Sequence, residues 1–286
     1  PMALVNARMS PRSAARWSRA PGLAAAALSA FRLVLARSES DRARLAALGA
    51  EAACWGDLKA AAPPLPADPA ALARLRETVG RRPVFLAAQT HPGEDTLVVA
   101  AHRTALAAHP DLLTVIVPRH PDRGEAVTAE ASASGLPVAR RTTGGAPRPG
   151  VSIYVADTMG ELGLFYRLAT AAFVGGSLVP HGGQNPLEPA RLHCPILLGP
   201  HTHNFEEPVA RLLAAGGAQV VEDGAALARG VADMLASPDR ARAMAEAAAA
   251  VADAGAGLPE RVAAALLDLL PPEGADLAPV NEMNEG

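Results

Sequence analysis

The residues of this sequence best suited to binding a phosphorylated ligand follow short apolar runs. Pro118 and Arg119 come after the run at residues 113–117, where the fork of guanidinium donors could meet a phosphate. The run at 152–156 leads into Asp157-Thr158-Met159-Gly160-Glu161. Thr158 and Glu161 have the spacing of a capping box, and the helix it predicts would present the N–H groups of Met159, Gly160 and Glu161 to an anion.

A second turn of this kind is predicted by the stretch GGSLVPHGGQNPLEP, residues 175–189. Asn185 suits an N-cap, Pro186 the first helical position, Leu187 the second and Glu188 the third. Capping does not account for His181 or for the two glycine pairs around it, which would let the backbone approach a ligand closely. We therefore expect the Glu188 carboxylate to accept hydrogen bonds from a ribose diol, as acidic residues do in other α/β nucleotide sites.

The histidines also point to one binding crevice. All eight lie between residues 91 and 203, and five of them follow apolar runs. The pair in His201-Thr202-His203 has no third ligand at a suitable spacing, so neither a metal nor a cofactor is expected. The sequence lacks the GxGxxG, GxxxxGK[ST] and GxSxG motifs, which excludes the usual dinucleotide-binding, P-loop and α/β-hydrolase sites.

The elements that must position these residues alternate along the chain. Continuous apolar runs, typical of strands buried on both faces, alternate with amphipathic stretches, which predicts an α/β fold with a mostly parallel sheet. Ligands of such sheets bind beyond the carboxyl ends of the strands. The expected strands are Arg32–Ala36, Val84–Ala88, Leu113–Val117, Ser152–Ala156, Ala171–Val174, Pro195–Leu198 and Gln219–Val221, and the expected helices lie at 40–48, 96–108, 161–168, 208–215, 225–236 and 240–256.

Composition limits the class of partner and compartment. The net charge is −3, which argues against a nucleic acid as the main partner. No apolar run approaches the length of a membrane span, and Cys54 and Cys194 lie far apart, so we expect a soluble, intracellular chain. Lys59 is the only lysine among 26 basic residues. Lysine carries a compact charge on a flexible stem, unlike the planar fork of arginine.

Three regions are expected. Residues 1–59 hold one convincing strand and two helices, too few for an α/β layer, and we interpret them as the closing elements of a larger domain. The Pro/Ala connector at 60–69 begins the main α/β domain, residues 60–270. Residues 271–286 are acidic, contain proline and are expected to form a flexible tail.

An ordered set of motifs resembles one enzyme family. NARMSPRSAARW, GDLK, PRH, DTMGEL, FVGGSLVPHGGQNPLEPA and GPHTHNF occur in this order. The set resembles the 3-deoxy-D-manno-octulosonic acid (Kdo) transferases, which are GT-B glycosyltransferases. The resemblance implies a complete C-terminal, Rossmann-like domain that binds CMP-Kdo, and a partly present N-terminal domain that binds a lipid A precursor.

The resemblance also implies residue roles. Contacts with CMP fall on Pro118, Arg119, Met159–Glu161 and Asn185–Glu188, and further contacts with the donor on Lys59, Ser177 and His181. It implies an inverting, metal-independent transfer of Kdo in lipopolysaccharide synthesis at the cytoplasmic face of the bacterial inner membrane, with membrane attachment through an N-terminal segment. Asp57 replaces an asparagine of the family motif that includes Lys59.

The catalytic base of this chain is unknown from the sequence. The family's general-base glutamate and its membrane-anchoring segment have no counterpart in these residues, and Glu39 and Glu94 are the candidate substitutes. Two alternatives stay open. One is another GT-B enzyme, either a UDP-sugar transferase or an isomerase like UDP-GlcNAc 2-epimerase, and the other is a nucleotide-binding module without turnover.

Overall fold

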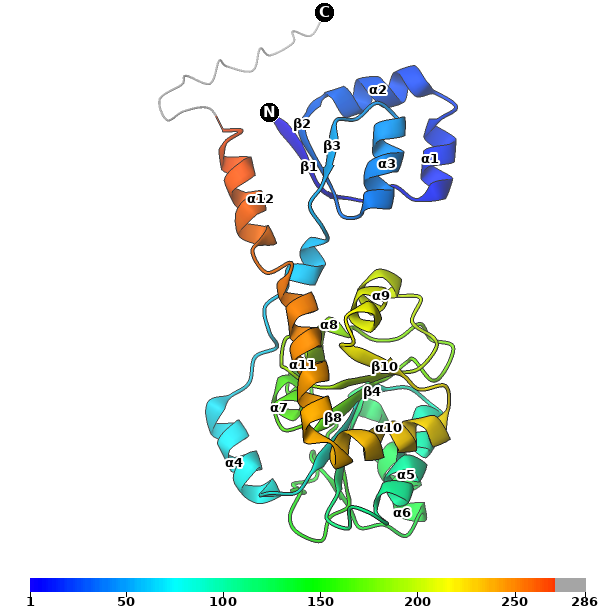
Figure 1. Cartoon of the computed structure of the whole chain (residues 1–286), viewed down its shortest axis with the longest axis vertical. Coiled ribbons are helices and arrows are strands. Elements are labelled where there is room, and N and C mark those ends of the chain that lie inside the picture. The colour runs from blue at the N-terminus through cyan, green and yellow to red at the C-terminus, as the bar shows by residue number, and fades with distance from the viewer. Residues whose placement is uncertain (271–286) are drawn as a thin grey trace, which may run out of the picture. The chain divides into compact units, whose positions relative to one another are not determined.

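The structure, a computed structural model, describes residues 1–270, apart from the side chains of Lys59 and Ala60 (Figure 1). The expected tail at 271–286 lies outside the described residues. The chain divides into two compact units: Pro1–Ala62 together with the residues from Gly255 on, and Pro63–Ala254. No helix in the described part of the chain has the length and apolar character needed to cross a membrane.

The first unit is built on a three-stranded parallel sheet in the order β1 (Met2–Ala7), β2 (Phe31–Ala36), β3 (Ala52–Cys54). The strand predicted at Arg32–Ala36 is present as β2, but the expectation that this region holds a single strand is wrong, because β1 and β3 flank it. β1 begins with four apolar residues but is mostly half-exposed, and β3 is largely exposed, so neither has the full burial of the central strands of the second unit. The helices of this unit are α1 (Pro11–Trp17), α2 (Pro21–Ser29), α3 (Glu39–Ala47), η1 (Leu58–Ala61) and α12 (Leu258–Leu267).

The sequence analysis placed the residues of helix α12 in a domain of residues 60–270, and the structure does not bear out this boundary. Leu258 and Val262 of α12 instead pack with Leu35 of β2, inside the first unit. The Arg261 guanidinium also lies 3.9 Å from the centre of the Trp55 ring. The chain therefore returns to its first unit after completing the second, which a linear division of the sequence does not express.

The second unit contains a seven-stranded, entirely parallel sheet in the order β10-β9-β8-β4-β5-β7-β6. The sheet reverses its direction of growth at β4: β5, β7 and β6 lie on one side of it, and β8, β9 and β10 on the other. A crevice for ligands is expected at such a switch point. The strands are β4 (Val84–Thr90), β5 (Leu113–Pro118), β6 (Val138–Arg140), β7 (Ile153–Val155), β8 (Ala171–Val174), β9 (Ile196–Leu198) and β10 (Ala218–Val220).

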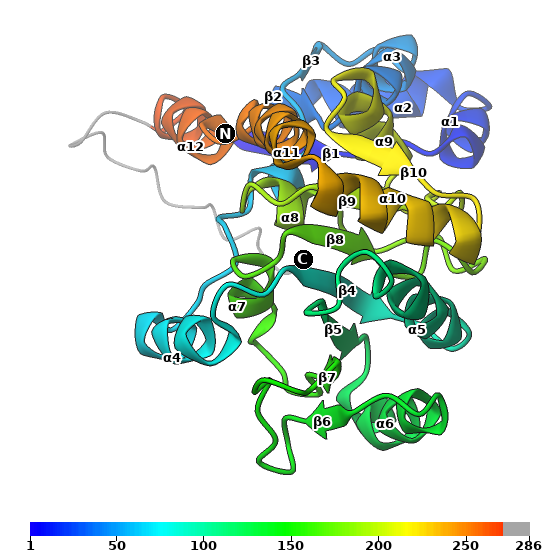
Figure 2. The ribbon, with the colours of Figure 1, turned by 60° about the horizontal axis from the view of Figure 1, so that its bottom comes forward.

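Helices cover both faces of this sheet, as its continuously apolar strands require. Phe85 and Ala87 of β4 face one core cluster, and Leu86 and Ala88 face the other. Figure 2 shows α5 and α6 on one side and α4 and α7 on the other. The helical segments are α4 (Pro69–Val79), α5 (Glu94–Ala105), η2 (Pro121–Arg123), α6 (Gly124–Ala133), α7 (Leu162–Tyr166), α8 (Leu187–Ala190), α9 (Glu206–Ala214), α10 (Gly224–Ala236) and α11 (Pro238–Asp253).

Candidate functional site

The loops that leave β4, β5 and β8 are joined at the switch point of the sheet. The Arg119 N–H donates to the Thr90 carbonyl at 3.0 Å, and the Gly175 N–H donates to the Ala88 carbonyl at 2.8 Å. The loop after β8 then folds back on itself, because Gly183 and Gln184 donate their N–H groups to Gly176 and Gly175 at 2.7 and 3.0 Å. Residues more than 80 positions apart in sequence thus share one edge of the sheet.

Glu188 lies at this edge of the sheet, half-buried, and accepts a hydrogen bond from a side chain at the end of β4. Gln89 donates its amide N–H to the Glu188 carboxylate at 3.2 Å. Burial raises the pKa of Glu188, while hydrogen bonds from Asn185 and Gln89 and the positive charge of Arg119 oppose this shift. The structure therefore brings together three residues that the sequence analysis assigned to CMP: Arg119, Asn185 and Glu188.

The predicted turn before Glu188 is present, with a small shift. The Asn185 side chain accepts a hydrogen bond from the Leu187 N–H at 3.1 Å, as an N-cap does, although regular helix α8 begins at Leu187 and not at Pro186. Pro186 and Leu187 are buried, so the packing of their side chains in the interior stabilises the turn.

Three histidines lie beside this turn. The His181 ring packs on the His91 ring with centroids 3.7 Å apart, and the His120 ring meets His91 edge-on at 6.4 Å. Burial lowers the pKa of His91 to about 4, helped by the nearby His181, His120, Arg123 and Arg119. His91 is therefore neutral at neutral pH, and its Nε2 atom can accept the hydrogen bond from the Gln184 amide, 2.9 Å away.

The loop after β7 differs from the expected capping box. Helix α7 begins at Leu162, so Glu161 occupies the N-cap position and Thr158 lies outside the helix. Gly160 adopts a positive φ of 79°, and the Thr158 hydroxyl donates to the Glu161 carboxylate. Met159, 74% exposed, and Gly160 therefore belong to a loop, and their N–H groups are not those of a helical first turn.

Arg141 is the physical reason for this difference. Its guanidinium donates to both Glu161 oxygens, at 2.6 and 2.5 Å, and to the Tyr154 hydroxyl at 3.1 Å. Hydrogen bonding from Arg141 lowers the pKa of Glu161, and burial opposes this. Because the side chain of Glu161 is bound in this way, it is directed at Arg141, and the backbone carbonyl of Glu161 accepts from the Leu164 N–H at 2.9 Å. β7 lies beside β5, so this loop leaves the same edge of the sheet as Arg119.

Glu94, at the start of α5, is a site component that the sequence analysis assigned differently. Its carboxylate is fully buried and accepts four backbone N–H groups: His91 at 2.9 Å, Gly176 at 2.7 Å, Ser177 at 3.0 Å and Leu178 at 2.9 Å. A carboxylate with its lone pairs occupied in this way cannot serve as a general base. The other candidate base, Glu39, is paired with Arg42 on the surface of the first unit.

The glycine pair at 175–176 and Ser177 have structural roles. A Cβ atom on Gly175 would lie 2.7 Å from the Gln89 carbonyl carbon and 2.8 Å from the Thr90 Cα, so close packing on β4 requires glycine there. The Ser177 side chain is fully buried, donating to the Val174 carbonyl at 2.5 Å and accepting from the Gly199 N–H at 2.8 Å. Gly175 and the Ser177 hydroxyl are therefore needed by the fold itself, and the expected contacts of these glycines and of Ser177 with a ligand stay predictions.

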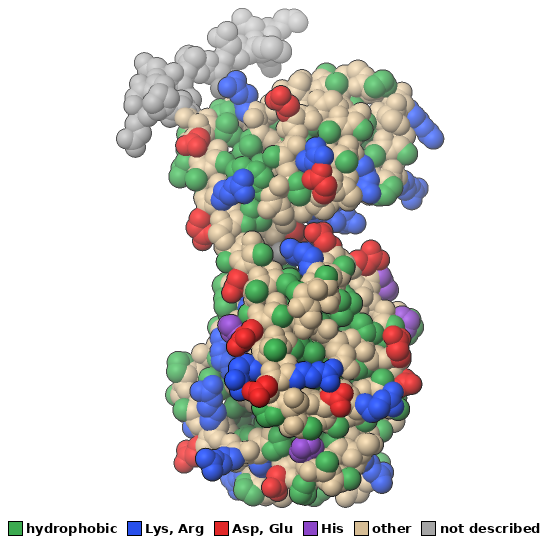
Figure 3. Space-filling model, viewed as in Figure 1, with side chains coloured by type: hydrophobic (Ala, Val, Ile, Leu, Met, Phe, Trp, Pro, Cys, Tyr) green, Lys and Arg blue, Asp and Glu red, His purple; other side chains and the backbone are tan. Residues whose placement is uncertain are grey.

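Other predicted features lie elsewhere. Lys59 belongs to η1 of the first unit, and its side chain is outside the described part of the structure. Among the described residues, no group of three His, Cys, Asp or Glu side chains is arranged to hold a metal ion. Figure 3 shows basic and acidic side chains interspersed on the visible face of the second unit.

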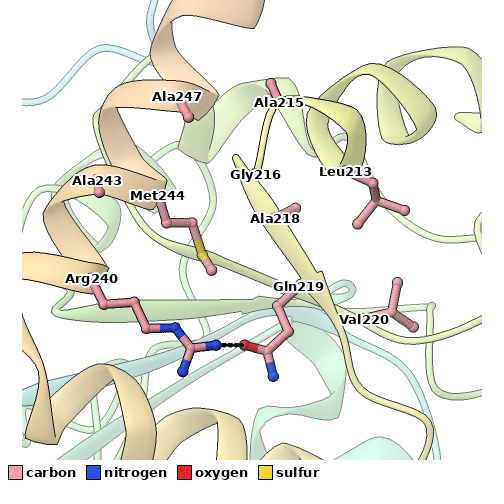
Figure 4. A pocket seen from close by; sticks show the side chains of 10 residues that line it. All are labelled: Leu213, Ala215, Gly216, Ala218, Gln219, Val220, Arg240, Ala243, Met244 and Ala247. Atoms are coloured by element: carbon pink, nitrogen blue, oxygen red, sulfur yellow. Dashed lines mark hydrogen bonds between the residues drawn. The ribbon is translucent and has the colours of Figure 1, made fainter.

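A hollow of about 660 Å³ between α9, β10 and α11 is separate from the residues assigned to CMP (Figure 4). It is lined mainly by apolar side chains, including Leu213, Val220 and Met244. Its charged residue, Arg240, donates to the Gln219 side chain at 3.1 Å. The hollow therefore lacks the phosphate and ribose partners that the edge of the sheet provides.

Comparison with known proteins agrees with the geometry. Residues 1–62 match the family model for 3-deoxy-D-manno-octulosonic-acid transferase (kdotransferase). The crystal structure of the C-terminal CMP-Kdo binding domain of WaaA from Acinetobacter baumannii is 31% identical, with a TM-score of 0.61, and the match covers 64% of this chain and 96% of that domain. The chain belongs to the Kdo transferase family. The predicted family and the α/β fold of GT-B type are thereby confirmed.

Two named Kdo transferases extend the match over most of the chain. The 3-deoxy-D-manno-octulosonic acid transferase of Bordetella pertussis is 37% identical over 94% of this chain, and that of Haemophilus influenzae is 35% identical over 95%. The chain spans 64% of the length of each relative. The similarity therefore includes both units described here.

Proposed function

We propose that this chain carries the donor-binding part of a Kdo transferase and holds CMP-Kdo at the carboxyl edge of the seven-stranded sheet. One observation carries the proposal: Arg119, Asn185 and Glu188 converge at the switch point of a unit that is similar to a CMP-Kdo binding domain. Glu188 would accept hydrogen bonds from the ribose hydroxyls. Arg119 and the backbone of Met159–Glu161 would face the phosphate, and Pro118 and Pro186–Leu187 would shape the rest of the CMP site.

In the proposed reaction, a hydroxyl oxygen of the acceptor attacks the anomeric carbon of Kdo, and the bond from that carbon to the phosphate oxygen breaks. CMP leaves with the bonding electron pair, and a general base takes the hydroxyl proton. Arg119 would stabilise the charge that develops on the leaving phosphate, as preorganised donors do in other transfer reactions. Lys59 and His181 are proposed as further donor contacts.

The acceptor and location follow from the family. We propose a lipid A precursor as the acceptor and the cytoplasmic face of the inner membrane as the place of reaction, in lipopolysaccharide synthesis. Transfer of Kdo to a lipid IVA-type acceptor would be measured with this chain and with a chain extended upstream. Turnover by the extended chain supports the proposal, and absence of turnover by both chains contradicts it.

Calorimetry tests the donor site directly. CMP is expected to bind the wild-type chain more tightly than UDP, and Glu188→Ala is expected to weaken CMP binding by about 10- to 100-fold, the cost of losing hydrogen bonds to a charged group. Equal CMP affinities in the two proteins would remove the ribose role. A preference for UDP would favour a UDP-sugar enzyme instead.

A further inference from the structure

The backbone N–H groups of the loop after β8 form a concave set of donors, and a carboxylate of the protein itself already binds to them. Successive N–H groups in a turn make an anion-binding nest, which in many α/β proteins receives a phosphate. Here Gly176, Ser177 and Leu178 all point their N–H groups at the carboxylate of Glu94. A phosphate therefore has no free amides to bind at this position.

The contacts of Glu94 link two loops. One oxygen accepts from His91 of the β4 loop and from Gly176 of the β8 loop, and the other accepts from Ser177 and Leu178. Glu94 is also the first residue of α5, where the helix dipole favours a negative charge. Burial raises the pKa of Glu94, and the four backbone N–H donors oppose this shift because they favour the ionised carboxylate. Loss of any of these partners would leave a desolvated polar group.

A series of contacts connects Glu94 to the residues assigned to CMP. The Gly176 carbonyl accepts a hydrogen bond from the Gly183 N–H at 2.7 Å. This bond fixes the returning limb of the loop, which begins at Gly183. On this limb, the Gln184 side-chain amide lies 2.9 Å from the His91 Nε2 atom. Asn185 and Glu188 follow directly. The limb that carries the ribose partner is thus fixed at its base by Glu94.

We propose that Glu94 is a positioning residue of the donor site: its carboxylate holds the loop at residues 175–188 in the geometry that binds the nucleotide. This inference rests on the proposed donor-binding function. Glu94 does not touch the ligand in this proposal, and it acts through the loop that carries Asn185 and Glu188.

The test compares Glu94→Gln with Asp95→Asn. Asp95 is the neighbouring buried carboxylate; it accepts from the Thr90 hydroxyl at 2.6 Å and pairs with Arg123, and makes none of the bonds to the β8 loop described above. Both substitutions neutralise a buried charge, so both are expected to lower the melting temperature. In Glu94→Gln, the side-chain NH2 group would face backbone N–H groups, and two donors cannot form a hydrogen bond with each other. Only this substitution should therefore disturb the loop after β8.

Two measurements decide the outcome. Glu94→Gln is expected to weaken CMP binding by at least about tenfold, and to speed hydrogen exchange at the amides of residues 176–178 by a similar factor, which corresponds to one lost charged hydrogen bond. Asp95→Asn should keep CMP affinity within about threefold of wild type. If Glu94→Gln does not fold, Glu94→Asp, which keeps the charge but reaches less far, is measured in the same way.

The results separate this proposal from the proposed function. Wild type that binds CMP, with weaker binding in Glu188→Ala and in the Glu94 variant but not in Asp95→Asn, supports both. Unchanged CMP affinity in the folded Glu94 variant overturns the positioning role and leaves the donor site intact. Equal losses in the Glu94 and Asp95 variants also overturn it, because they would reflect general destabilisation. Wild type that fails to bind CMP contradicts the proposed function itself.

Discussion

The Arg141 guanidinium holds the Glu161 carboxylate by two parallel hydrogen bonds, 2.6 Å from Nε to Oε2 and 2.5 Å from Nη2 to Oε1. This pair joins the loop after β6 to the loop after β7. It turns the acidic residue of the DTMGEL motif away from its expected place inside a helix. The position of the exposed Met159-Gly160 backbone therefore depends on a residue 20 positions earlier in the chain.

Replacement of Arg141 by lysine is expected to lower the free energy of unfolding by about 1–2 kcal/mol, because a single ammonium group cannot satisfy both oxygens. The Glu161 pKa is lowered in the folded state by Arg141, so this stabilisation is present above the unfolded pKa near 4.5 and is lost as the pH falls through the folded pKa. Urea unfolding at pH 4 and pH 7 measures the difference. Arg240→Lys, at a half-exposed pair with Asp233, should change stability by less than about 0.5 kcal/mol; an equal loss in both variants would contradict the prediction.

Substitution of Glu188 by glutamine is expected to separate stability from binding. Burial raises the Glu188 pKa in the folded state, so the carboxyl group contributes stability below its unfolded pKa of about 4.5 and this is lost as the pH rises through the folded pKa. Glu188→Gln should therefore be at least as stable as wild type at pH 8, while binding CMP about tenfold more weakly. As the pH is lowered, the CMP affinity of the wild type should begin to fall at a pH above 4.5. Calorimetry across pH 4.5–8 checks this, and a pH-independent affinity would count against an ionised ribose partner.

His102 makes stability depend on pH from inside the core. It is fully buried, its Nδ1 lies 2.8 Å from the Thr114 hydroxyl, and its Nε2 has no hydrogen-bond partner among the described residues. Burial lowers its pKa from 6.5 to about 4, with a contribution from Arg82. The unfolded chain therefore binds a proton more readily, and stability should fall as the pH drops from about 6.5 toward 4.

The double substitution His102→Leu with Thr114→Val removes both polar partners and should flatten that pH dependence at little cost in stability at pH 7.5. His203→Gln, at an exposed histidine, is the control and should leave the slope unchanged. Unfolding curves at pH 5 and pH 7.5 provide the test. A slope that persists in the double variant would assign it to other groups.

Gly175→Ala is expected to cost about 2 kcal/mol or more and to reduce CMP binding, because its Cβ would press on the backbone of Gln89 and Thr90, which cannot move aside as a flexible side chain would. Gly22→Ala, at a helical position with nothing within 4 Å of the added Cβ, should be neutral or stabilising by up to about 1 kcal/mol. Thermal unfolding and calorimetry measure both. Wild-type behaviour of Gly175→Ala would show that the loop can shift.

Much of the second unit could be predicted because its strands repeat one strong local pattern. Val84–Ala88, Leu113–Val117 and Ala171–Val174 are continuous apolar runs, and all three are central strands. The edge strand β6, with the sequence Val-Ala-Arg, was missed because it is short and only half-buried. Shortness alone does not hide a strand, since β7, β9 and β10 also have three residues each and were predicted; β6 differs in that none of its residues is fully buried.

The convergence of candidate site residues was predicted by the rule that ligands meet the carboxyl ends of parallel strands, and their contacts with CMP stay predictions. That rule placed Arg119 and Glu188 in one crevice, and the structure brings them together. It could not find the role of Glu94, because its partner Gly176 is 82 residues away and no local motif pairs them. The capping box at Thr158 failed for a similar reason, since Arg141 competes for its glutamate from another loop.

The internal carboxylate under the β8 loop has a consequence for how a nucleotide meets this surface. The backbone at residues 175–184 is held by Glu94, by Ala88 and by its own returning limb before any ligand is present. Little conformational entropy remains to be lost there on association. We expect ligand-free and CMP-bound crystals to superpose in this segment to within about 1 Å. An inhibitor can therefore be designed against one rigid conformation of this segment, because the segment does not have to change conformation when a ligand binds.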